Sequence, residues 1–393
     1  MLRGQLPAIA VLAITAACGD DLTAPQGPEE GKITFRKVIV DPAYRAEGVA
    51  IFDVNRDDIY DLVTEEQWYQ GPDYGAHELR VPRAWDPETE YSHSFGAFHR
   101  DLDGDSYDDL IVIGPPGEAA TWCANPRGQD QHWECHMITP RASGESPLFV
   151  DLFQNDRNLL ILGTEPDLRL GWVQPTSPPE AEWTMDAVTP PSFPYAGRYE
   201  HGLGVGDLNR DRRLDIITGS GWLEQPAAGT TRPWMWHPVT LCPNDCSHMY
   251  VYDVNGDGLQ DVIGTSPHGY GVRWWEQQPG LLDEISFTEH VIDRSLSQTH
   301  AARFVDLDGD RVPELVTGKR WFAHFTADPG ALEPALLVYY RMEREAGDVW
   351  WSRHIIDADS GVGTQFEVFD VNKDTRPDIV VANKKGLLYF EQQ

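Results

Sequence analysis

The sequence predicts an all-β protein, a seven-bladed β-propeller of four-stranded blades, and three observations lead to this fold class. An aspartate opens a short acidic turn seven times along the 393-residue chain. Apolar, β-prone runs flank these turns, and the unit recurs about every 50 residues, which is typical of propellers. The turns begin at Asp53, Asp101, Asp151, Asp207, Asp253, Asp306 and Asp370.

Blade five shows the predicted order of strands most clearly. A short apolar strand at 249–253 leads into the acidic turn, and three further strands follow at 261–265, 272–277 and 286–292. Alternating apolar and aromatic residues, with Gly and Pro between the runs, favour strands over helices throughout the chain. The equivalent first strands are expected at 49–52, 96–100, 148–150, 203–206, 302–305 and 366–369.

The two ends of the repeat predict how the ring closes. Residues 33–40 are similar to the fourth strands near Phe287 and His354, whereas the last repeat ends after its third strand. We expect the N-terminal strand to complete the seventh blade, because closure removes exposed sheet edges. The propeller is therefore predicted over residues 32–393, with an insertion at 323–334 that enlarges blade six.

The first residues are typical of an export signal. A basic start and an apolar stretch too short to span a bilayer predict a signal peptide at 1–17. It ends in Thr-Ala-Ala-Cys, which resembles a bacterial lipobox, so we expect acylation of Cys18 and a flexible tether over 18–31. The protein would then be anchored by lipid to the bacterial cell envelope. Ordinary signal cleavage near Cys18 is the alternative, and it would give a secreted protein.

The charge of the chain excludes several partners. Asp and Glu number 63 against 31 Lys and Arg, which gives a formal net charge of -32. Such a chain repels phosphate backbones and anionic membrane surfaces, so we expect no nucleic acid and no membrane contact beyond the lipid anchor. A carbohydrate or protein ligand is the expected partner, and the protein is expected to be a monomer.

Four further cysteines indicate disulfides, because an even number in an exported chain is usually paired. Three pairings are possible, and the local one is favoured because each pair would flank a hairpin or a short turn. A Cys-x-x-x-Cys metal site is the rival interpretation for the second pair. The local pairing joins Cys123 to Cys135 and Cys242 to Cys246.

The acidic turns fit the pattern D-x-[ND]-x-D-x-x-x-[DE], which predicts calcium binding. Side chains at positions 1, 3, 5 and 9 would surround the ion, and ligands that are all oxygen suit Ca²⁺ rather than a transition metal. The turn at Asp151 has lost these ligands. Asx turns without an ion are the alternative. The expected ligands are Asp53, Asn55, Asp57 and Asp61; Asp101, Asp103, Asp105 and Asp109; Asp207, Asn209, Asp211 and Asp215; Asp253, Asn255, Asp257 and Asp261; Asp306, Asp308, Asp310 and Glu314; and Asp370, Asn372, Asp374 and Asp378.

These turns resemble the calcium loops of FG-GAP and VCBS repeat proteins, including the integrin alpha head. The resemblance covers residues 32–393 and implies a propeller stabilised by several calcium ions. An EF-hand is excluded because strands, not helices, flank the turns. The family often has glycine at position 6, and here only Gly258 provides it. The turns at Asp253, Asp101 and Asp306 are therefore the best expected calcium sites.

The opposite end of the propeller is predicted to hold the functional site. The acidic turns join first to second strands, so the segments that enter first strands and those that join second to third strands must meet at the other end. Polar groups at a channel mouth are the default ligand site, although any one of them alone would be an ordinary surface residue. The candidates are Glu47, His201, His248 and His300 for chemistry, and His268, Tyr270, Lys319, Arg320, Lys384 and Lys385 for ligand binding.

The residues at this mouth suggest two possible functions. The first is binding of a carbohydrate or protein ligand, in which the lysines and arginine favour an anionic or polyhydroxylated molecule. The second is a carbon–oxygen lyase, because stretches such as TGKRWFAH and VANKKG distantly resemble the propeller domain of aldos-2-ulose dehydratase. That resemblance implies a transition metal on His201, His248 and His300, with Glu47 as a base. The sequence leaves it open whether the protein is an enzyme.

Overall fold

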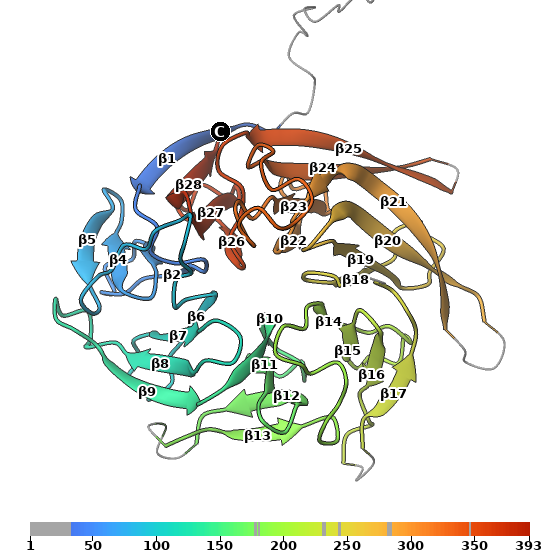
Figure 1. Ribbon diagram of the computed structural model, residues 1–393, viewed down its shortest axis with the longest axis horizontal. Helices are drawn as coiled ribbons and strands as arrows, with labels where there is room; N and C mark the ends of the chain where they lie inside the picture. The colour runs from blue at the N-terminus through green and yellow to red at the C-terminus, as the bar shows by residue number, and fades with distance from the viewer. Residues whose placement is uncertain are drawn as a thin grey trace, which may run out of the picture. The chain divides into compact units, whose positions relative to one another are not determined.

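The computed structural model describes residues 33–176, 179, 181–229, 233–242, 245–280, 285–345 and 347–393. The predicted signal peptide at 1–17, Cys18 and the tether at 18–31 lie outside the described residues. The described residues hold 28 strands in seven four-stranded antiparallel sheets. No helix among them is long and apolar enough to cross a membrane. The predicted seven-bladed, all-β propeller is therefore confirmed (Figure 1).

Each blade is one sheet, and in six blades its strands follow chain order. Blade one is β2 (Ala50–Phe52), β3 (Asp61–Val63), β4 (Gln67–Gln70) and β5 (Gly75–Glu78). Blade two is β6 (Gly96–Arg100), β7 (Asp109–Ile113), β8 (Ala120–Ala124) and β9 (Glu134–Thr139). Blade three is β10 (Ala142–Val150), β11 (Leu159–Thr164), β12 (Arg169–Gln174) and β13 (Thr184–Ala187). Blade four is β14 (Leu203–Gly206), β15 (Asp215–Thr218), β16 (Gly221–Glu224) and β17 (Met235–Pro238).

The remaining blades complete the ring. Blade five is β18 (Tyr250–Tyr252), β19 (Asp261–Thr265), β20 (Tyr270–Gln278) and β21 (Ser286–Ser297). Blade six is β22 (Ala302–Val305), β23 (Glu314–Gly318), β24 (Leu337–Glu345) and β25 (Asp348–Asp357). Blade seven is β26 (Phe366–Phe369), β27 (Asp378–Asn383), β28 (Gly386–Gln392) and the N-terminal strand β1 (Phe35–Asp41). First strands of neighbouring blades contact one another, as β2 does with β6 and β26, which places them around the central channel.

The N-terminal strand closes the ring, as the sequence predicts. β1 pairs antiparallel with β28, with Val38 opposite Tyr389 and Phe35 opposite Gln392. Phe35 and Ile33 also pack against the apolar cluster between blades six and seven. The first and last strands of the propeller therefore share one sheet, and the outer edge of blade seven is covered by a strand from the other end.

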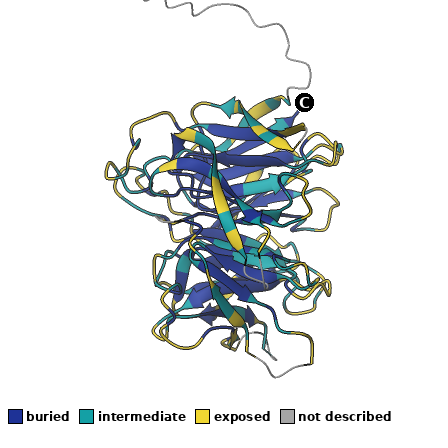
Figure 2. Cartoon of the chain, turned by 90° about the vertical axis from the view of Figure 1, so that its right-hand side faces the viewer, coloured by how far each residue is buried: buried dark blue, intermediate teal, exposed yellow. Residues whose placement is uncertain are grey.

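Apolar side chains between adjacent blades form the core. Trp222 of blade four and Trp275 of blade five are buried in one cluster, and Trp274 is buried in the cluster between blades five and six. Figure 2 shows this as buried strands with exposed turns and outer edges. Trp222 also stacks on His237 of the neighbouring strand, with ring centroids 4.0 Å apart. The large rings thus fill the space between blades.

Both predicted local disulfides are present. Cys123 is bonded to Cys135 across β8 and β9, and Cys242 is bonded to Cys246 in the loop that leads to blade five. The rival interpretation of the second pair as a metal site is therefore wrong, because a disulfide uses the thiols that a metal would need.

One strand boundary differs from the prediction and affects the channel mouth. β10 begins at Ala142 instead of 148, and its register shifts between Ser143 and Leu148. The backbone N–H of Glu145 within this irregular stretch donates to the carbonyl of Glu200 in the next blade. The extension therefore fixes Glu145 beside the segment that enters blade four.

Candidate functional site at the channel mouth

Three histidines from three blades meet at the mouth of the channel. His201 precedes β14, His300 precedes β22, and His268 lies in the connection between β19 and β20. The ring centroids are 4.7 Å apart for His201 and His268, 5.6 Å for His201 and His300, and 5.5 Å for His268 and His300. One ring nitrogen from each lies within 4.8 Å of one from each of the others. The topology thus brings together residues far apart in sequence.

Backbone carbonyls fix the tautomers of two of these rings. Nδ1 of His201 lies 2.8 Å from the carbonyl oxygen of Tyr199, and Nδ1 of His300 lies 3.2 Å from that of Gln298. A carbonyl oxygen can only accept, so each Nδ1 carries the proton and each Nε2 keeps its lone pair. Both Nε2 atoms are buried without a hydrogen-bond partner in the described part of the chain. Metal-binding histidines are commonly held in this way.

The blade-six insertion adds a fourth imidazole and a carboxylate. Its His324 ring lies 4.7 Å from that of His268 and 5.5 Å from that of His300. Oδ2 of Asp328 lies 2.6 Å from Nδ1 of His324 and 3.5 Å from Nδ1 of His268. Neither insertion residue was predicted as part of the site. Their spacing of one helical turn outside a strand was the only signal that could have singled them out.

The spacing of the rings fits a tetrahedral transition-metal ion. Zinc binds imidazole nitrogen at about 2.0–2.1 Å, which places the centroids of two bound rings about 5 Å apart. The observed separations lie close to this value. Burial, with Arg320 nearby, also lowers the pKa of His300 well below its usual value, which keeps the imidazole neutral as a ligand must be. His201, His268 and His300 could therefore hold such a metal.

A buried ion-pair network lies beside the histidines. The Arg320 side chain donates through Nε to Glu47, and its Nη1 lies 3.5 Å from Oε2 of Glu145. Oε2 of Glu145 is also 3.4 Å from Nε2 of His201, yet neither atom completes a hydrogen bond among the described residues. Burial opposes ionisation of Glu145, but the Arg320 guanidinium beside it favours the charged form and holds its pKa below the usual value. Glu145 is thus a carboxylate whose Oε2 faces Arg320 and His201.

Glu47, the predicted base, is committed to structure. It is fully buried, and it accepts from the Tyr44 hydroxyl at 2.7 Å and from Arg320. Burial opposes its ionisation, but the charges of Arg320 and Lys384 outweigh that effect and lower the pKa of Glu47. The geometry places Glu145, not Glu47, next to the histidine nitrogens.

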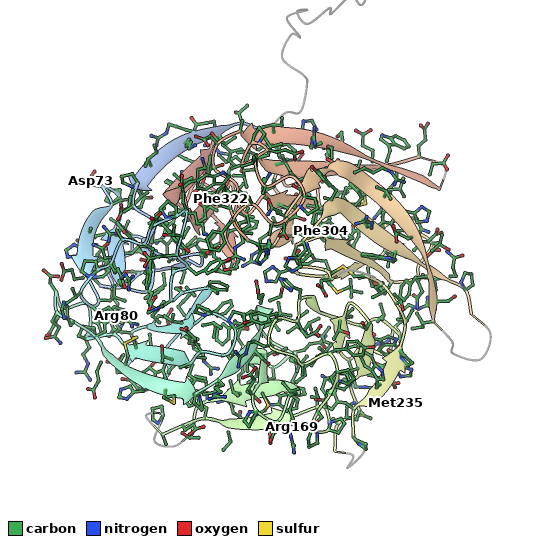
Figure 3. All side chains as sticks on the ribbon, viewed as in Figure 1. Asp73, Arg80, Arg169, Met235, Phe304 and Phe322 are labelled. Atoms are coloured by element: carbon green, nitrogen blue, oxygen red, sulfur yellow. A yellow bond between two sulfur atoms is a disulfide. The ribbon has the colours of Figure 1, made fainter. Side chains whose placement is uncertain are left out.

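The predicted ligand-binding cations hold the insertion in place. Lys319 donates to the carbonyls of Gly330 and Glu333, and Lys384 donates to that of Phe322 at 3.0 Å. Figure 1 shows the connection from β23 to β24 on the inner side of the ring beside β26, and Phe322 lies over blade seven in Figure 3. Lys319, Arg320 and Lys384 are buried. Their charged groups are therefore engaged by the protein itself, and their role in binding an anionic ligand stays a prediction.

The other predicted mouth residues fall into two groups. His248 is buried, and burial with Arg303 nearby lowers its pKa to about 3. Its nitrogens do not join the three-histidine group among the described residues, and His268 stands in its place. Tyr270 and Lys385 are at the surface, where they contact Glu333 at 2.6 Å and Asp359 at 2.5 Å.

The acidic turns share one geometry at the opposite end of the blades. In the blade-five turn, Asp253 accepts from the N–H groups of Gly256 and Gly258 at 2.7 and 3.0 Å. Position 6 has a positive φ in all six complete turns, as at Gly258 (φ 85°) and Arg311 (φ 72°), which explains the family's glycine there. Carboxylate oxygens converge in two turns, on Asp101, Asp103 and Asp109 and on Asp306, Asp308 and Glu314.

The acid at position 9 ties five of the turns to the end of the third strand, through Asp61, Asp109, Asp215, Asp261 and Asp378. Asp261 is fully buried, and its two oxygens accept from the N–H groups of Val254 and Gln277 at 2.8 and 2.7 Å. Burial, reinforced by Asp257 and Asp253, raises its pKa to about 6. A nearby cation would relieve this penalty. The turns thus have the donor chemistry of calcium sites, and also the Asx-type hydrogen bonds of the alternative interpretation.

A cavity also lies away from the histidines, at the acidic-turn end of the channel. It measures about 620 Å³ and is lined by residues of β2, β6, β10 and β26 and of adjoining turns. His99 projects there and holds Asp108, with Nδ1 2.7 Å from Oδ2. Size alone does not make this the functional site, because the unsatisfied buried nitrogens are at the other end.

Fold and turns together define a seven-bladed β-propeller with repeated acidic turns, and comparison with known proteins agrees. Residues 253–317 match the FG-GAP-like repeat family, which confirms the resemblance that the acidic turns indicate. No curated protein sequence matches the chain significantly. The distant resemblance to aldos-2-ulose dehydratase stays a prediction.

Three solved structures are similar to this chain. A lectin from Agrocybe aegerita that recognises non-reducing terminal N-acetylglucosamine is 14% identical, with a TM-score of 0.43 over 84% of this chain and 82% of that one. The V. cholerae biofilm matrix protein Bap1 is 13% identical, with a TM-score of 0.34 over 82% and 44%. The Photorhabdus luminescens Tc holotoxin pore is 14% identical, with a TM-score of 0.35 over 85% and 16%.

Proposed function

We propose that this protein is a ligand-binding β-propeller whose channel mouth holds a transition-metal ion on His201, His268 and His300, and that an oxygen-rich ligand binds at this metal. One observation carries the proposal. The three histidines converge, and two of their Nε2 atoms are buried without a partner in the described structure. Leaving such atoms unsatisfied costs about 1–3 kcal/mol each, so a bound metal accounts for the arrangement.

Metal analysis tests the proposal directly. The protein is dialysed against calcium, loaded with zinc, dialysed again, and its metal content measured by mass spectrometry. We expect about one zinc per chain, and loss of that zinc in the double variant His201→Ala/His300→Ala. His237→Ala is the matched control, because this histidine stacks on Trp222 in the outer part of blade four. Equal zinc in the double variant and the wild type would overturn the proposal.

A lyase acting on a keto sugar or uronate is the second candidate, and the position of Glu145 favours it. A bound metal would polarise a substrate carbonyl or hydroxyl oxygen. The Glu145 carboxylate lies 3.4 Å from His201 Nε2, so it would be close enough to accept a proton from a substrate at the metal. Arg320 would stabilise the negative charge that develops on that substrate. Incubation of zinc-loaded protein with 1,5-anhydrofructose and with uronate oligomers tests turnover. New ultraviolet absorbance supports the lyase, and binding without absorbance supports the pure binding function.

Calcium and export complete the proposal. Calcium ions in the acidic turns would stabilise the blades from the opposite end, as the converging carboxylates of two turns support. Export, with a lipid anchor at Cys18 or secretion without it, is supported by the two disulfides, which persist in oxidising compartments. Radiolabelled palmitate incorporation in a bacterial host, lost in Cys18→Ala, would test the anchor.

A further inference from the structure

A cavity of about 300 Å³ adjoins the histidine group through His268. It lies on the mouth side between blades four and five, because Trp275 and the bonded Cys242 and Cys246 in its lining pack in the cluster that joins those blades. Arg273 also lines it. Ligand pockets measure about 300–1,000 Å³, so this one suits a single sugar unit more than an oligomer.

The Arg273 guanidinium is fixed at the wall of this cavity. Its Nε donates to Glu289 at 3.0 Å, and its Nη2 donates to the carbonyl of Tyr270 at 3.3 Å. A Cβ atom on Gly271, whose φ is 135°, would lie 2.1 Å from Nη1 of Arg273. Because glycine has no Cβ, position 271 leaves room for the Arg273 guanidinium. The side chain is 29% exposed, so it is held in place yet accessible.

We propose that this cavity is the binding chamber for a monosaccharide that carries a carboxylate, with the carboxylate on Arg273 and the ring oxygens directed past His268 to the metal. The inference rests on the proposed metal-centred function. Guanidinium groups recognise carboxylates through paired hydrogen bonds, and an arginine already oriented by two acceptors loses little freedom on binding. Tyr270 and Trp275 provide aromatic surface in the same lining.

The test uses zinc-loaded full-length protein and two probes, glucuronate and glucose, measured by isothermal titration calorimetry. We expect glucuronate to bind more tightly than glucose, and Arg273→Met to weaken glucuronate at least tenfold with no change for glucose. Arg353→Met is the matched control, because Arg353 is also a partly exposed strand arginine, 2.9 Å from Asp293. Zinc content is measured for every variant.

The outcomes separate the two proposals. If zinc does not bind, the metal-centred function fails. If zinc binds and Arg273→Met retains wild-type affinity for glucuronate, the carboxylate chamber is wrong and the metal site stands. Absence of glucuronate binding to the zinc-loaded wild type also overturns the chamber. Equal weakening in Arg353→Met would show a general effect of lost surface charge and would contradict the inference.

Discussion

Asp328 and His268 come from different blades, and Oδ2 of the first lies 3.5 Å from Nδ1 of the second. The same oxygen lies 2.6 Å from Nδ1 of His324. One carboxylate of the insertion therefore orients two imidazoles, and a proton on the Nδ1 of His268 that faces it leaves the lone pair on Nε2. Carboxylates in this position tune metal affinity without touching the metal.

We expect Asp328→Ala to weaken zinc binding by about 10–100-fold, the usual cost of losing such a partner. Asp328→Asn keeps an acceptor oxygen, so its zinc affinity should fall between that of Asp328→Ala and that of the wild type. Competition with a fluorescent zinc chelator measures the affinity. Glu333→Gln, in the same insertion but bonded to the Tyr270 hydroxyl, serves as the control. An unchanged affinity in Asp328→Ala would remove Asp328 from the site.

The pH dependence of the free energy of unfolding should reveal the raised pKa of a buried acid, Glu65. Arg80 lies 3.2 Å from its carboxylate, but Arg80 is 36% exposed and Glu65 is buried. Burial therefore dominates and raises the pKa of Glu65 from 4.5 to about 7. The folded state binds more protons than the unfolded state between these two values, so this group's contribution to stability is full below pH 4.5 and lost as pH rises to about 7.

Glu65→Gln should remove this loss. We expect the variant to gain stability relative to wild type as pH rises from 4.5 to 8, by up to about 3 kcal/mol, since one pKa unit is worth about 1.4 kcal/mol. Urea denaturation at several pH values measures the difference. Glu78→Gln, at an exposed position, should show no such trend. A constant difference between Glu65→Gln and wild type across this pH range would contradict the assigned pKa.

Calcium dependence should differ between complete and incomplete turns. Asp253 heads a complete turn, whereas the Asp151 turn retains the hydrogen bonds to Asn155 and Asp156 without the other acids. An ion held at 100 times its dissociation constant stabilises a protein by about 2.7 kcal/mol. We expect Asp253→Asn to reduce the calcium-dependent rise in Tm, and Asp151→Asn to leave it unchanged. A Tm that does not respond to EDTA in the wild type would favour Asx turns without ions.

The fold could be predicted because its sequence pattern repeats in every blade. Part of the site could not, because the residues at the mouth do not repeat. Strands, blade order and closure follow from a pattern that recurs in every blade, so errors at one turn do not matter. The mouth residues occur once each. His201, His300 and His268 were found because topology places their positions at one end, whereas the choice among neighbouring histidines depends on side-chain direction. His248 enters blade five at the equivalent position, yet it is buried apart from the group.

The insertion explains the other errors. No repeat aligns with it, so the positions of His324 and Asp328 could not be predicted. Its backbone carbonyls also satisfy Lys319 and Lys384, which looked like ligand-binding cations because their blades place them at the mouth. Cations that the repeat places at the mouth can thus be bound by the backbone of a segment outside the repeat.

Removal of β1 should abolish cooperative folding. β1 forms the fourth strand of blade seven, and Phe35 and Ile33 pack between blades six and seven. Deletion of residues 33–41 would expose β28 as a sheet edge and open the ring. We expect the single calorimetric transition to broaden or disappear, whereas deletion of 19–31 should leave it intact. An undiminished transition without β1 would show that closure is unnecessary.

The metal should also hold the insertion over the mouth. His324 and Asp328 contact His268, while Lys319 and Lys384 bind the insertion backbone from below. Loss of zinc would free Nε2 of His268 from the metal and so weaken the hold of this ring on His324 and Asp328 of the insertion. We expect a zinc-selective chelator, with calcium held constant, to speed proteolysis within 323–334 several-fold, since Leu332 there is 81% exposed. His300→Ala should be cleaved at the faster rate without chelator, and His237→Ala at the wild-type rate. Equal cleavage with and without zinc would mean that the lysines alone hold the insertion.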